Sequence, residues 1–229
     1  MLNIEHFTFN PFQTRCSIVW DETGACAIVD PGAYGAEETA ELKGFIAAKS
    51  LKPVCIMLTH CHFDHIFGVA EFARSYGVPV FMHEEEVYTI ETTNPTVSRF
   101  YGLPLPDASF IIGEGAEAAA RFVKEGETIE VGSLRFEVIE TPGHSKGGLC
   151  YLERKEKVMF CGDTIFAGAI GRTDHPGGDY DTLMKSIFEK LLCLDGETAV
   201  IPGHGPESDI STERMTNPFL LPFNEPYEE

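Results

Sequence analysis

Apolar residues recur along the chain with two spacings, one typical of strands and one typical of helices. In the first half, short apolar or alternating runs predict strands, and longer stretches with apolar positions three or four residues apart predict helices. The turn-forming residues 21–24 separate two of the strands and indicate a β-hairpin. The predicted strands cover residues 7–9, 17–20, 25–29, 54–58 and 78–82, and the predicted helices cover residues 36–50 and 65–76.

The pattern breaks in the middle of the chain and then resumes. Between residues 94 and 115, Pro, Gly and short apolar pieces follow one another without a period, and we expect a loop that serves as a lid or an insertion. Strands are predicted at residues 128–131, 134–139, 148–152, 158–161 and 199–202, with a helix at residues 180–192. In both halves, the first strands are thus followed by a helix and then by a further strand. This order favours an α/β fold with two sheets face to face and helices outside, a four-layer αββα sandwich.

Composition and charge narrow the class of protein. The 229 residues suit a single domain, their hydrophobic share is 43%, and no apolar run reaches the roughly 20 residues that cross a bilayer. The N-terminus lacks a signal-peptide pattern, so we expect a cytoplasmic protein without membrane association. The net charge of -19 argues against a nucleic-acid partner. Seven irregularly spaced cysteines, mostly within apolar runs, predict reduced and buried thiols.

Side chains that bind metals follow the ends of predicted strands. Three His and one Asp fall within residues 60–65, directly after a strand, and His144, Asp163 and His204 each follow another strand beside a glycine. Strand ends are the usual place for a ligand site in α/β sheets. This density of imidazole and carboxylate suits zinc or non-haem iron better than calcium or magnesium. A solvated loop with scattered histidines is the alternative, and it would bind no metal.

The spacing of these residues resembles a known family signature. The motif His60-x-His62-x-Asp64-His65, with His144, Asp163 and His204 downstream, is similar to the five-part signature of the metallo-β-lactamase superfamily. Asp30-Pro31-Gly32 resembles its first motif. Over about residues 15–220 the chain looks most like the glyoxalase II group of hydroxyacylglutathione hydrolases, especially its short bacterial members. The similar segments are residues 59–68, 141–145, 162–164, 171–174 and 213–219.

The resemblance implies a site with two divalent metal ions. It assigns His60, His62 and His144 to the first ion, Asp64, His65 and His204 to the second, and Asp163 to a bridging position. Asp64 and Asp163 would be the catalytic carboxylates. Zinc is expected, and iron or manganese also suits these ligands. Two such ions lower the pKa of a shared water toward roughly 7, and the resulting hydroxide would attack the carbonyl of a small-molecule thioester.

Other residues near these motifs are expected to support or surround the site. Asp30 is expected to accept a hydrogen bond from a ligand histidine and so set its tautomer, or to form an Asx turn with the next two residues, and both can hold. Cys61 is expected to be a packed thiol rather than a ligand. Of His6, His83 and His175, only His175 is expected near the site.

The substrate depends on residues outside the metal motifs. The resemblance to the glyoxalase II group implies an acylglutathione substrate, and the chemistry fits because a thiol of pKa about 8.5 leaves without a strong general acid. Typical glyoxalase II enzymes hold glutathione with basic residues of a C-terminal helical domain, whereas only a short tail follows His204 here. Lys146 and Arg172 are the nearby cations expected to contact the substrate. Each is equally well explained as a surface or ion-pair residue.

Three other functions are weighed against thioester hydrolysis, and the oligomeric state is left open. Residues 59–62 and 171–174 also resemble the mononuclear iron persulfide dioxygenases, in which His60, His144 and Asp163 would bind one iron. The chain could instead be a non-catalytic metal-binding or redox scaffold domain, although a scaffold needs none of the seven ligand-type residues. The lack of a periplasmic signal argues against a β-lactamase.

Overall fold

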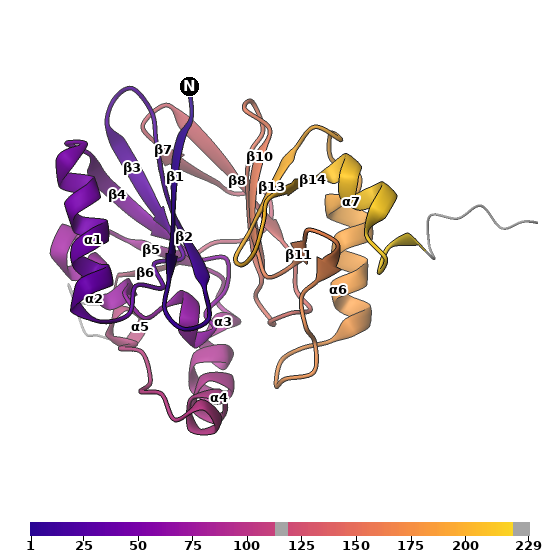
Figure 1. The fold of residues 1–229 in the computed structure, drawn as a ribbon, viewed down its shortest axis with the longest axis horizontal. Helices are drawn as coiled ribbons and strands as arrows, with labels where there is room; N and C mark the ends of the chain where they lie inside the picture. The colour runs from indigo at the N-terminus through magenta and orange to yellow at the C-terminus, as the bar shows by residue number, and fades with distance from the viewer. Residues whose placement is uncertain (113–118, 222–229) are drawn as a thin grey trace, which may run out of the picture.

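The computed structural model describes residues 1–112 and 119–221. These residues form two six-stranded sheets, which pack against each other and carry helices on their outer sides (Figure 1). The predicted four-layer αββα sandwich is therefore confirmed. Helices α1 and α2 cover the first sheet, and helices α6 and α7 cover the second.

The first sheet combines an antiparallel and a parallel half. Its strands follow the order β1-β2-β3-β4-β5-β6, antiparallel from β1 to β3 and parallel from β3 to β6. The predicted hairpin is present, because β2 and β3 pair across the turn at residues 21–24. Pro53 lies in β4 where the register with β3 shifts, a position that tolerates the missing N–H donor. The bounds are β1 Asn3–Phe9, β2 Thr14–Trp20, β3 Ala25–Val29, β4 Lys52–Met57, β5 Val80–Met82 and β6 Ala120–Phe122.

The second sheet is mainly antiparallel. Its order is β14-β13-β10-β9-β8-β7, and only β10 and β13 run parallel. The bounds are β7 Thr128–Val131, β8 Leu134–Glu140, β9 Leu149–Glu153, β10 Val158–Gly162, β13 Ala199–Pro202 and β14 Ser208–Asp209, and a separate pair consists of β11 Ile165–Phe166 and β12 Ala169–Ile170. The outer helices α6, Tyr180–Ser186, and α7, Ile210–Thr216, each begin after an aspartate whose side chain accepts a hydrogen bond from the backbone N–H three residues on.

The layers are held together by strands that are buried on both faces. In β2, Ile18 packs toward the outer helices while its neighbour Val19 packs between the sheets, as the alternation of side chains along a strand requires. Leu42 of α1, Gly35–Ala48, and Phe72 of α2, Val69–Tyr76, close the outer side of the first sheet. Continuous apolar runs in the sequence therefore correspond to strands covered on both sides.

Asp21 ties the two sheets together at the end away from the strand-end histidines. Its carboxylate is 1% exposed and accepts hydrogen bonds from the backbone and hydroxyl of Thr23, in its own turn, and of Ser133, between β7 and β8. Burial disfavours its charge, but the hydrogen bonds from Ser133 and Thr23 outweigh burial and hold the pKa of Asp21 well below its usual value. The ionised carboxylate therefore links turns from two different sheets.

Replacing Asp21 with alanine should lower the free energy of unfolding at pH 7 by about 2–3 kcal/mol, because buried N–H donors lose a charged acceptor. Since the folded pKa is depressed, this contribution is present above the unfolded pKa of about 4 and fades as the pH falls below it. Urea denaturation at pH 7 and at pH 3 checks both points, with the exposed neighbour replaced in Glu22→Ala as control. An equal difference at both pH values would contradict the role of the ionised carboxylate.

The middle of the chain is more regular than its sequence indicated. Residues 94–112, read as part of a loop, contain helix α4, Asn94–Tyr101, and helix α5, Ser109–Ile112. Helix α3, Glu86–Tyr88, and a π-helical turn, Thr89–Thr93, lead into α4 without a break. The run continues through Pro95, which lies in the first turn of α4 directly after the π-helical turn. Residues 113–115 lie outside the described part, and the role of a lid stays a prediction.

Two other expectations concern the chain as a whole. Within residues 1–112 and 119–221, no helix has the length and apolar character needed to cross a membrane. All seven cysteines are free, and six of them are buried. Burial raises the pKa of the Cys61 and Cys161 thiols well above the usual value. The predicted burial of the thiols thus holds for six of the seven.

Candidate metal centre

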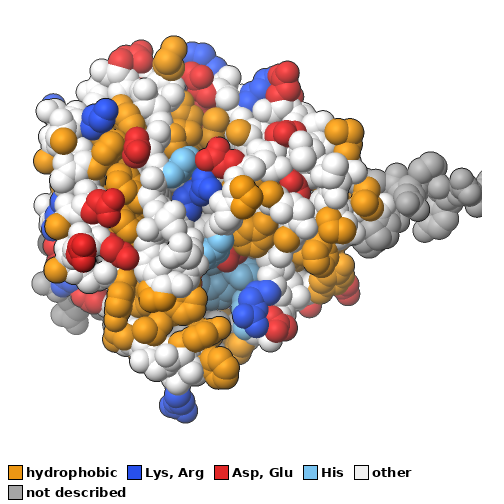
Figure 2. Space-filling view, in the orientation of Figure 1, with side chains coloured by type: hydrophobic (Ala, Val, Ile, Leu, Met, Phe, Trp, Pro, Cys, Tyr) orange, Lys and Arg blue, Asp and Glu red, His pale blue; other side chains and the backbone are white. Residues whose placement is uncertain are grey.

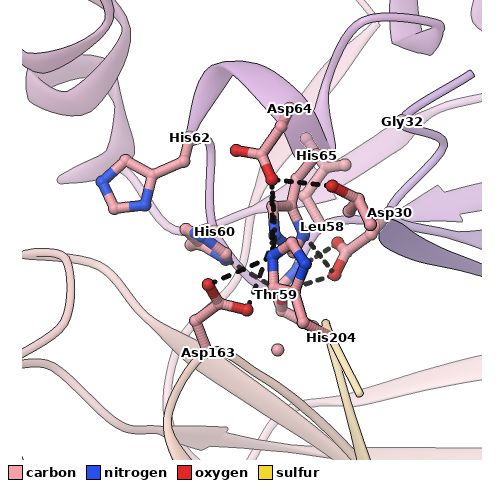
Figure 3. A network of polar contacts seen from close by, with 12 residues as sticks. Asp30, Gly32, Leu58, Thr59, His60, His62, Asp64, His65, Asp163 and His204 are labelled. Carbon is pink, nitrogen blue, oxygen red and sulfur yellow. Dashed lines mark hydrogen bonds and ion pairs between the residues drawn. The ribbon is translucent and has the colours of Figure 1, made fainter. Parts of the chain in front are cut away.

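The predicted ligands come together from the ends of strands in both sheets. His60 and His62 follow β4, and Asp64 and His65 lie in a short 3-10 turn, Phe63–His65, before α2. His144, Asp163 and His204 follow β8, β10 and β13 of the second sheet. Figure 3 shows Asp163 and His204 reaching across to His60, Asp64 and His65. The seven side chains therefore line the seam between the two sheets.

Three overlapping groups of these side chains have ligand atoms within 4.8 Å of one another. The groups are His60, His62 and His144, then His60, His65 and Asp163, and finally Asp64, His65 and His204. Asp163 lies between the outer two groups, with its Oδ2 3.6 Å from His144 Nε2 and 3.5 Å from His204 Nε2. The arrangement thus has two ends and a carboxylate in the middle.

Four of the five histidines have a contact that fixes the outer ring nitrogen. The Nδ1 atoms of His144 and His204 lie 2.8 Å and 3.1 Å from the backbone carbonyls of Arg172 and Phe12. His60 Nδ1 contacts the Thr59 hydroxyl at 3.1 Å. Such outer contacts set the tautomer and aim the other nitrogen at a metal. In each of these three residues Nε2 is left for the centre.

Asp30 supplies the fourth outer contact. Its Oδ2 lies 3.2 Å from His65 Nδ1 and also accepts a hydrogen bond from the Thr59 hydroxyl. The N–H of Gly32 donates to the backbone carbonyl of Asp30 rather than to its side chain, so this turn is closed by the backbone. The Asp30 side chain is thereby directed at His65. Asp64 is oriented in a similar way by the Thr14 hydroxyl, at 2.7 Å.

The two ends of the cluster differ in charge. Burial holds the pKa of His60 and His62 well below the usual value, and neighbouring imidazoles lower it further. At the other end, burial opposes the charge on His204, but hydrogen bonds to Asp163 and Asp64 raise its pKa to about 11. Burial also opposes the charge on Asp64, yet His65 and His204 lower its pKa to about 2. Neutral imidazoles and ionised carboxylates are the forms that bind metal ions.

The residues present fit bound metal ions. His60 Nε2 and Asp163 Oδ1 are buried and have no hydrogen-bond partner among the described residues, although buried polar atoms are normally paired. His65 Nε2 and His204 Nε2 lie 3.3 Å apart, and His62 Nδ1 and His144 Nε2 lie 2.9 Å apart. Two nitrogens on one tetrahedral zinc ion at 2.0–2.1 Å are about 3.3 Å apart. A cation between the rings would satisfy these atoms.

The loop that carries His60 and His62 is anchored from the helical segment before α4. Glu86 is 0% exposed, and its carboxylate accepts hydrogen bonds from the Cys61 N–H at 2.6 Å and the Gly147 N–H at 2.9 Å. Asn94, at the start of α4, donates to the Cys61 carbonyl at 2.9 Å. Glu86 therefore joins the loop before His62 to the loop after His144. Both peptide groups of Cys61 are held by side chains outside the predicted site.

The other residues singled out in the sequence lie at different distances from the cluster. His175 packs its ring 4.6 Å from that of His62 and 4.9 Å from that of His144. His6 contacts Ser17, and His83 contacts Glu140, so neither joins the cluster. Arg172 lines the cavity beside the cluster, and its guanidinium binds Asp174. Lys146 lies over the ring of Tyr88 at 3.7 Å and lines a different cavity.

Sequence reasoning missed several residues that support or line the site. Thr14, Glu86 and Asn94 orient ligands or ligand loops, and Phe12, Phe63 and Tyr101 form an aromatic cluster beside Asp64. The sequence held one usable signal, because Phe63 lies inside the ligand motif itself. The others come from distant segments, and their local sequence resembles that of ordinary turns and helices.

This chain combines a four-layer αββα sandwich with histidines and aspartates at the ends of its strands. Together these two features are typical of a class of metallo-hydrolases. The model of the metallo-beta-lactamase superfamily matches residues 9–204. The chain therefore belongs to the metallo-beta-lactamase superfamily.

Individual relatives agree with this membership. The hydroxyacylglutathione hydrolase GloC of Haemophilus influenzae is 36% identical over 219 residues, which cover 96% of this chain and 98% of that protein. The crystal structure of the BLEG-1 B3 metallo-beta-lactamase has a TM-score of 0.83 at 34% identity, covering 95% of this chain and 99% of that one. TTHA1623, solved in a di-iron-bound form, has a TM-score of 0.79 at 32% identity, with coverages of 94% and 100%.

Proposed function

We propose that this protein is a hydrolase with two divalent metal ions that cleaves a small-molecule thioester of the hydroxyacylglutathione type. The observation that carries the proposal is the pair of ligand groups on either side of Asp163, His60 with His62 and His144 at one end, and Asp64 with His65 and His204 at the other. The thioester is supported by the relative from Haemophilus influenzae, whose name states hydrolysis of hydroxyacylglutathione.

Each end of the cluster would hold one ion. We assign the first ion to His60, His62 and His144, the second to Asp64, His65 and His204, and a shared position to Asp163. We propose zinc, since imidazole and carboxylate are among its usual ligands, while iron and manganese suit the same donors. The di-iron form of the related structure supports iron as a second candidate.

The chemistry that two bound divalent cations supply is the activation of water near neutral pH and the polarisation of a carbonyl. The protein's own residues prepare this step. The contacts of Asp30 with His65, and of the Arg172 carbonyl with His144, hold each imidazole with one nitrogen facing the centre. Asp163 keeps its charge because burial, which disfavours it, is outweighed by His65 and His204, so its pKa is lowered. The centre is therefore arranged before substrate binds.

Thioester hydrolysis balances without a further reactant. The oxygen of water bonds to the carbonyl carbon, the C–S bond breaks, and sulfur leaves with the electron pair. A thiol of pKa about 8.5 is a good leaving group near neutral pH, so the reaction does not need a strong general acid. The products are a carboxylate and a thiol.

Two alternatives are less well supported by the described residues. A mononuclear iron centre would use only His60, His144 and Asp163, and it would leave no purpose for the separate group of Asp64, His65 and His204. A scaffold without bound metal would not need buried ring nitrogens without partners, whose burial costs free energy. Both features favour a binuclear metal site, and the hydrolase named among the relatives favours a catalytic one.

Purified protein loaded with zinc, iron or manganese tests the proposal. We expect two metal ions per chain by elemental analysis and release of glutathione from S-lactoylglutathione. A lactone and a β-lactam are tested as alternative substrates. The β-lactam is included because the chain is similar to the BLEG-1 metallo-beta-lactamase. One iron per chain with oxygen uptake would indicate the mononuclear alternative. A fully loaded protein that leaves every thioester intact would refute thioester hydrolysis.

A further inference from the structure

A cavity of about 480 Å³ lies beside the metal cluster and is bounded on one side by apolar side chains. Figure 2 shows histidine side chains at the floor of a hollow, with hydrophobic side chains gathered along the edge over α4. The ligands His62, Asp64, His144, Asp163 and His204 form the polar side of the cavity. The apolar wall consists of Phe12, Phe63, Val97, Phe100, Tyr101 and Pro176.

The aromatic part of this wall is assembled from three separate segments. The ring of Phe12, between β1 and β2, lies 4.8 Å from that of Phe63 and 5.1 Å from that of Tyr101, both edge to face. Phe63 stands directly between His62 and Asp64 in the chain, so the cluster is anchored beside two candidate ligands. Edge-to-face aromatic contacts of this kind fix the rings relative to one another. The wall is therefore a formed surface next to the reacting centre.

The mouth of the cavity is also apolar. Phe100 is 82% exposed and Tyr101 is 49% exposed, both at the end of α4. Exposed aromatic rings at the rim of a concave site are typical of places that bind ligands. A bound aryl or alkyl group would remove part of these rings from water.

Cations are scarce in the same cavity. Among its described lining residues, Arg172 is the one Lys or Arg, and its guanidinium binds both carboxylate oxygens of Asp174, at 2.7 and 2.9 Å. Lys146 lies outside this cavity, over Tyr88. Glutathione carries two carboxylates, and the cavity offers them only a guanidinium that is already paired. The described residues thus favour an apolar group more than an anionic one.

We infer that the substrate is a thioester with an aryl or branched alkyl group beside the scissile carbonyl, and that the wall formed by Phe12, Phe63, Val97, Phe100 and Tyr101 binds this group. The inference rests on the proposed thioester hydrolysis and narrows its substrate class. The group can belong to the acyl part or to the thiol part of the substrate. In an apolar pocket, a phenyl ring in place of a methyl group is expected to raise kcat/KM by at least about tenfold.

Two pairs of thioesters separate the acyl side from the thiol side. S-mandeloylglutathione against S-lactoylglutathione places a phenyl ring in the acyl group, and the lactoyl thioester of benzyl mercaptan against that of ethanethiol places one in the leaving group. With the zinc-loaded protein, kcat/KM should rise about tenfold in at least one pair. The pair that responds identifies the part of the substrate that the wall binds.

Phe100→Ala should reduce kcat/KM for the preferred aryl thioester about fivefold more than it reduces kcat/KM for S-lactoylglutathione. Phe122→Ala, which removes an exposed ring from the edge strand β6, is the matched control and should change neither. Turnover of all thioesters without an aryl preference, or equal loss on both substrates in Phe100→Ala, would overturn the inference while the proposed function stands. Failure to cleave any thioester would overturn both.

Discussion

Replacing Asp163 with alanine is expected to abolish metal binding and hydrolysis together. Its carboxylate lies within 3.6 Å of the Nε2 atoms of His65, His144 and His204, which belong to both ends of the cluster. Removing it takes away the donor that both ions would share and leaves adjacent cations without an anion between them. Loss of several kcal/mol of transition-state stabilisation corresponds to a decrease of roughly a thousandfold or more in kcat/KM.

Elemental analysis and thioester hydrolysis, measured on the same preparation, check this expectation. Asp181→Ala is a suitable control, because Asp181 is an exposed carboxylate in the first turn of α6. Circular dichroism spectra of both variants should match that of the wild-type protein, which checks that both are folded. Wild-type metal content and hydrolysis in Asp163→Ala would show that the site has been assigned wrongly.

Replacing Glu86 with alanine should weaken metal binding about 10–100-fold, although this side chain belongs to none of the candidate ligand groups. The change leaves the buried N–H groups of Cys61 and Gly147 without acceptors, and each should cost about 1–3 kcal/mol of stability. It also frees the loop before His62 from the loop after His144. Less exact orientation of the two histidines is the physical reason for the weaker binding.

A conservative variant separates this positioning role from general destabilisation. Glu86→Gln keeps one carbonyl acceptor but turns an NH₂ group toward the other N–H, so it should restore part of the affinity. In Co²⁺-substituted protein, the visible absorption bands report ligand geometry and should shift in Glu86→Ala. Glu84→Ala removes an exposed carboxylate two residues away and is the control. An unchanged Co²⁺ spectrum and wild-type affinity in Glu86→Ala would rule out the positioning role.

The effects expected for Asp163→Ala and Glu86→Ala both arise because residues from the two halves of the chain form the cluster together. The motif at residues 60–65 brings four candidate ligands to the end of β4, but their neutral and charged forms depend on partners from the second sheet. Asp64 illustrates this, since burial opposes its charge but His65 and His204 lower its pKa to about 2.

The helical segment from Glu86 to Tyr101 connects two parts of the proposed mechanism. Through Glu86 and Asn94 it holds the Cys61 peptide groups within the ligand loop, and through Val97 and Tyr101 it forms part of the cavity wall. A substrate group resting on α4 would therefore press on an element that is hydrogen bonded to the ligand loop. Substitutions in this segment should affect substrate preference and metal affinity at different residues.

The amino-acid sequence by itself determined the layered α/β fold and the residues most suited to bind metal. Apolar strands, helical spacing and turns such as residues 21–24 are local features, and short-range steric and hydrogen-bonding preferences govern them. The ligand motifs are equally local, because each follows a strand and the three later ones lie beside a glycine.

Tertiary structure decided which of these local features work together. Glu86 ends a run of three glutamates that reads as solvated surface, yet the packing of two ligand loops buries it completely. Asn94 and Pro95 open the segment for which a loop was expected, yet helix α4 begins there directly after the preceding helical turns. Arg172 lines the cavity beside the metal cluster, whereas Lys146 lines a different cavity. Such contacts join residues distant in sequence, so they depend on how the two sheets pack, which no local pattern encodes.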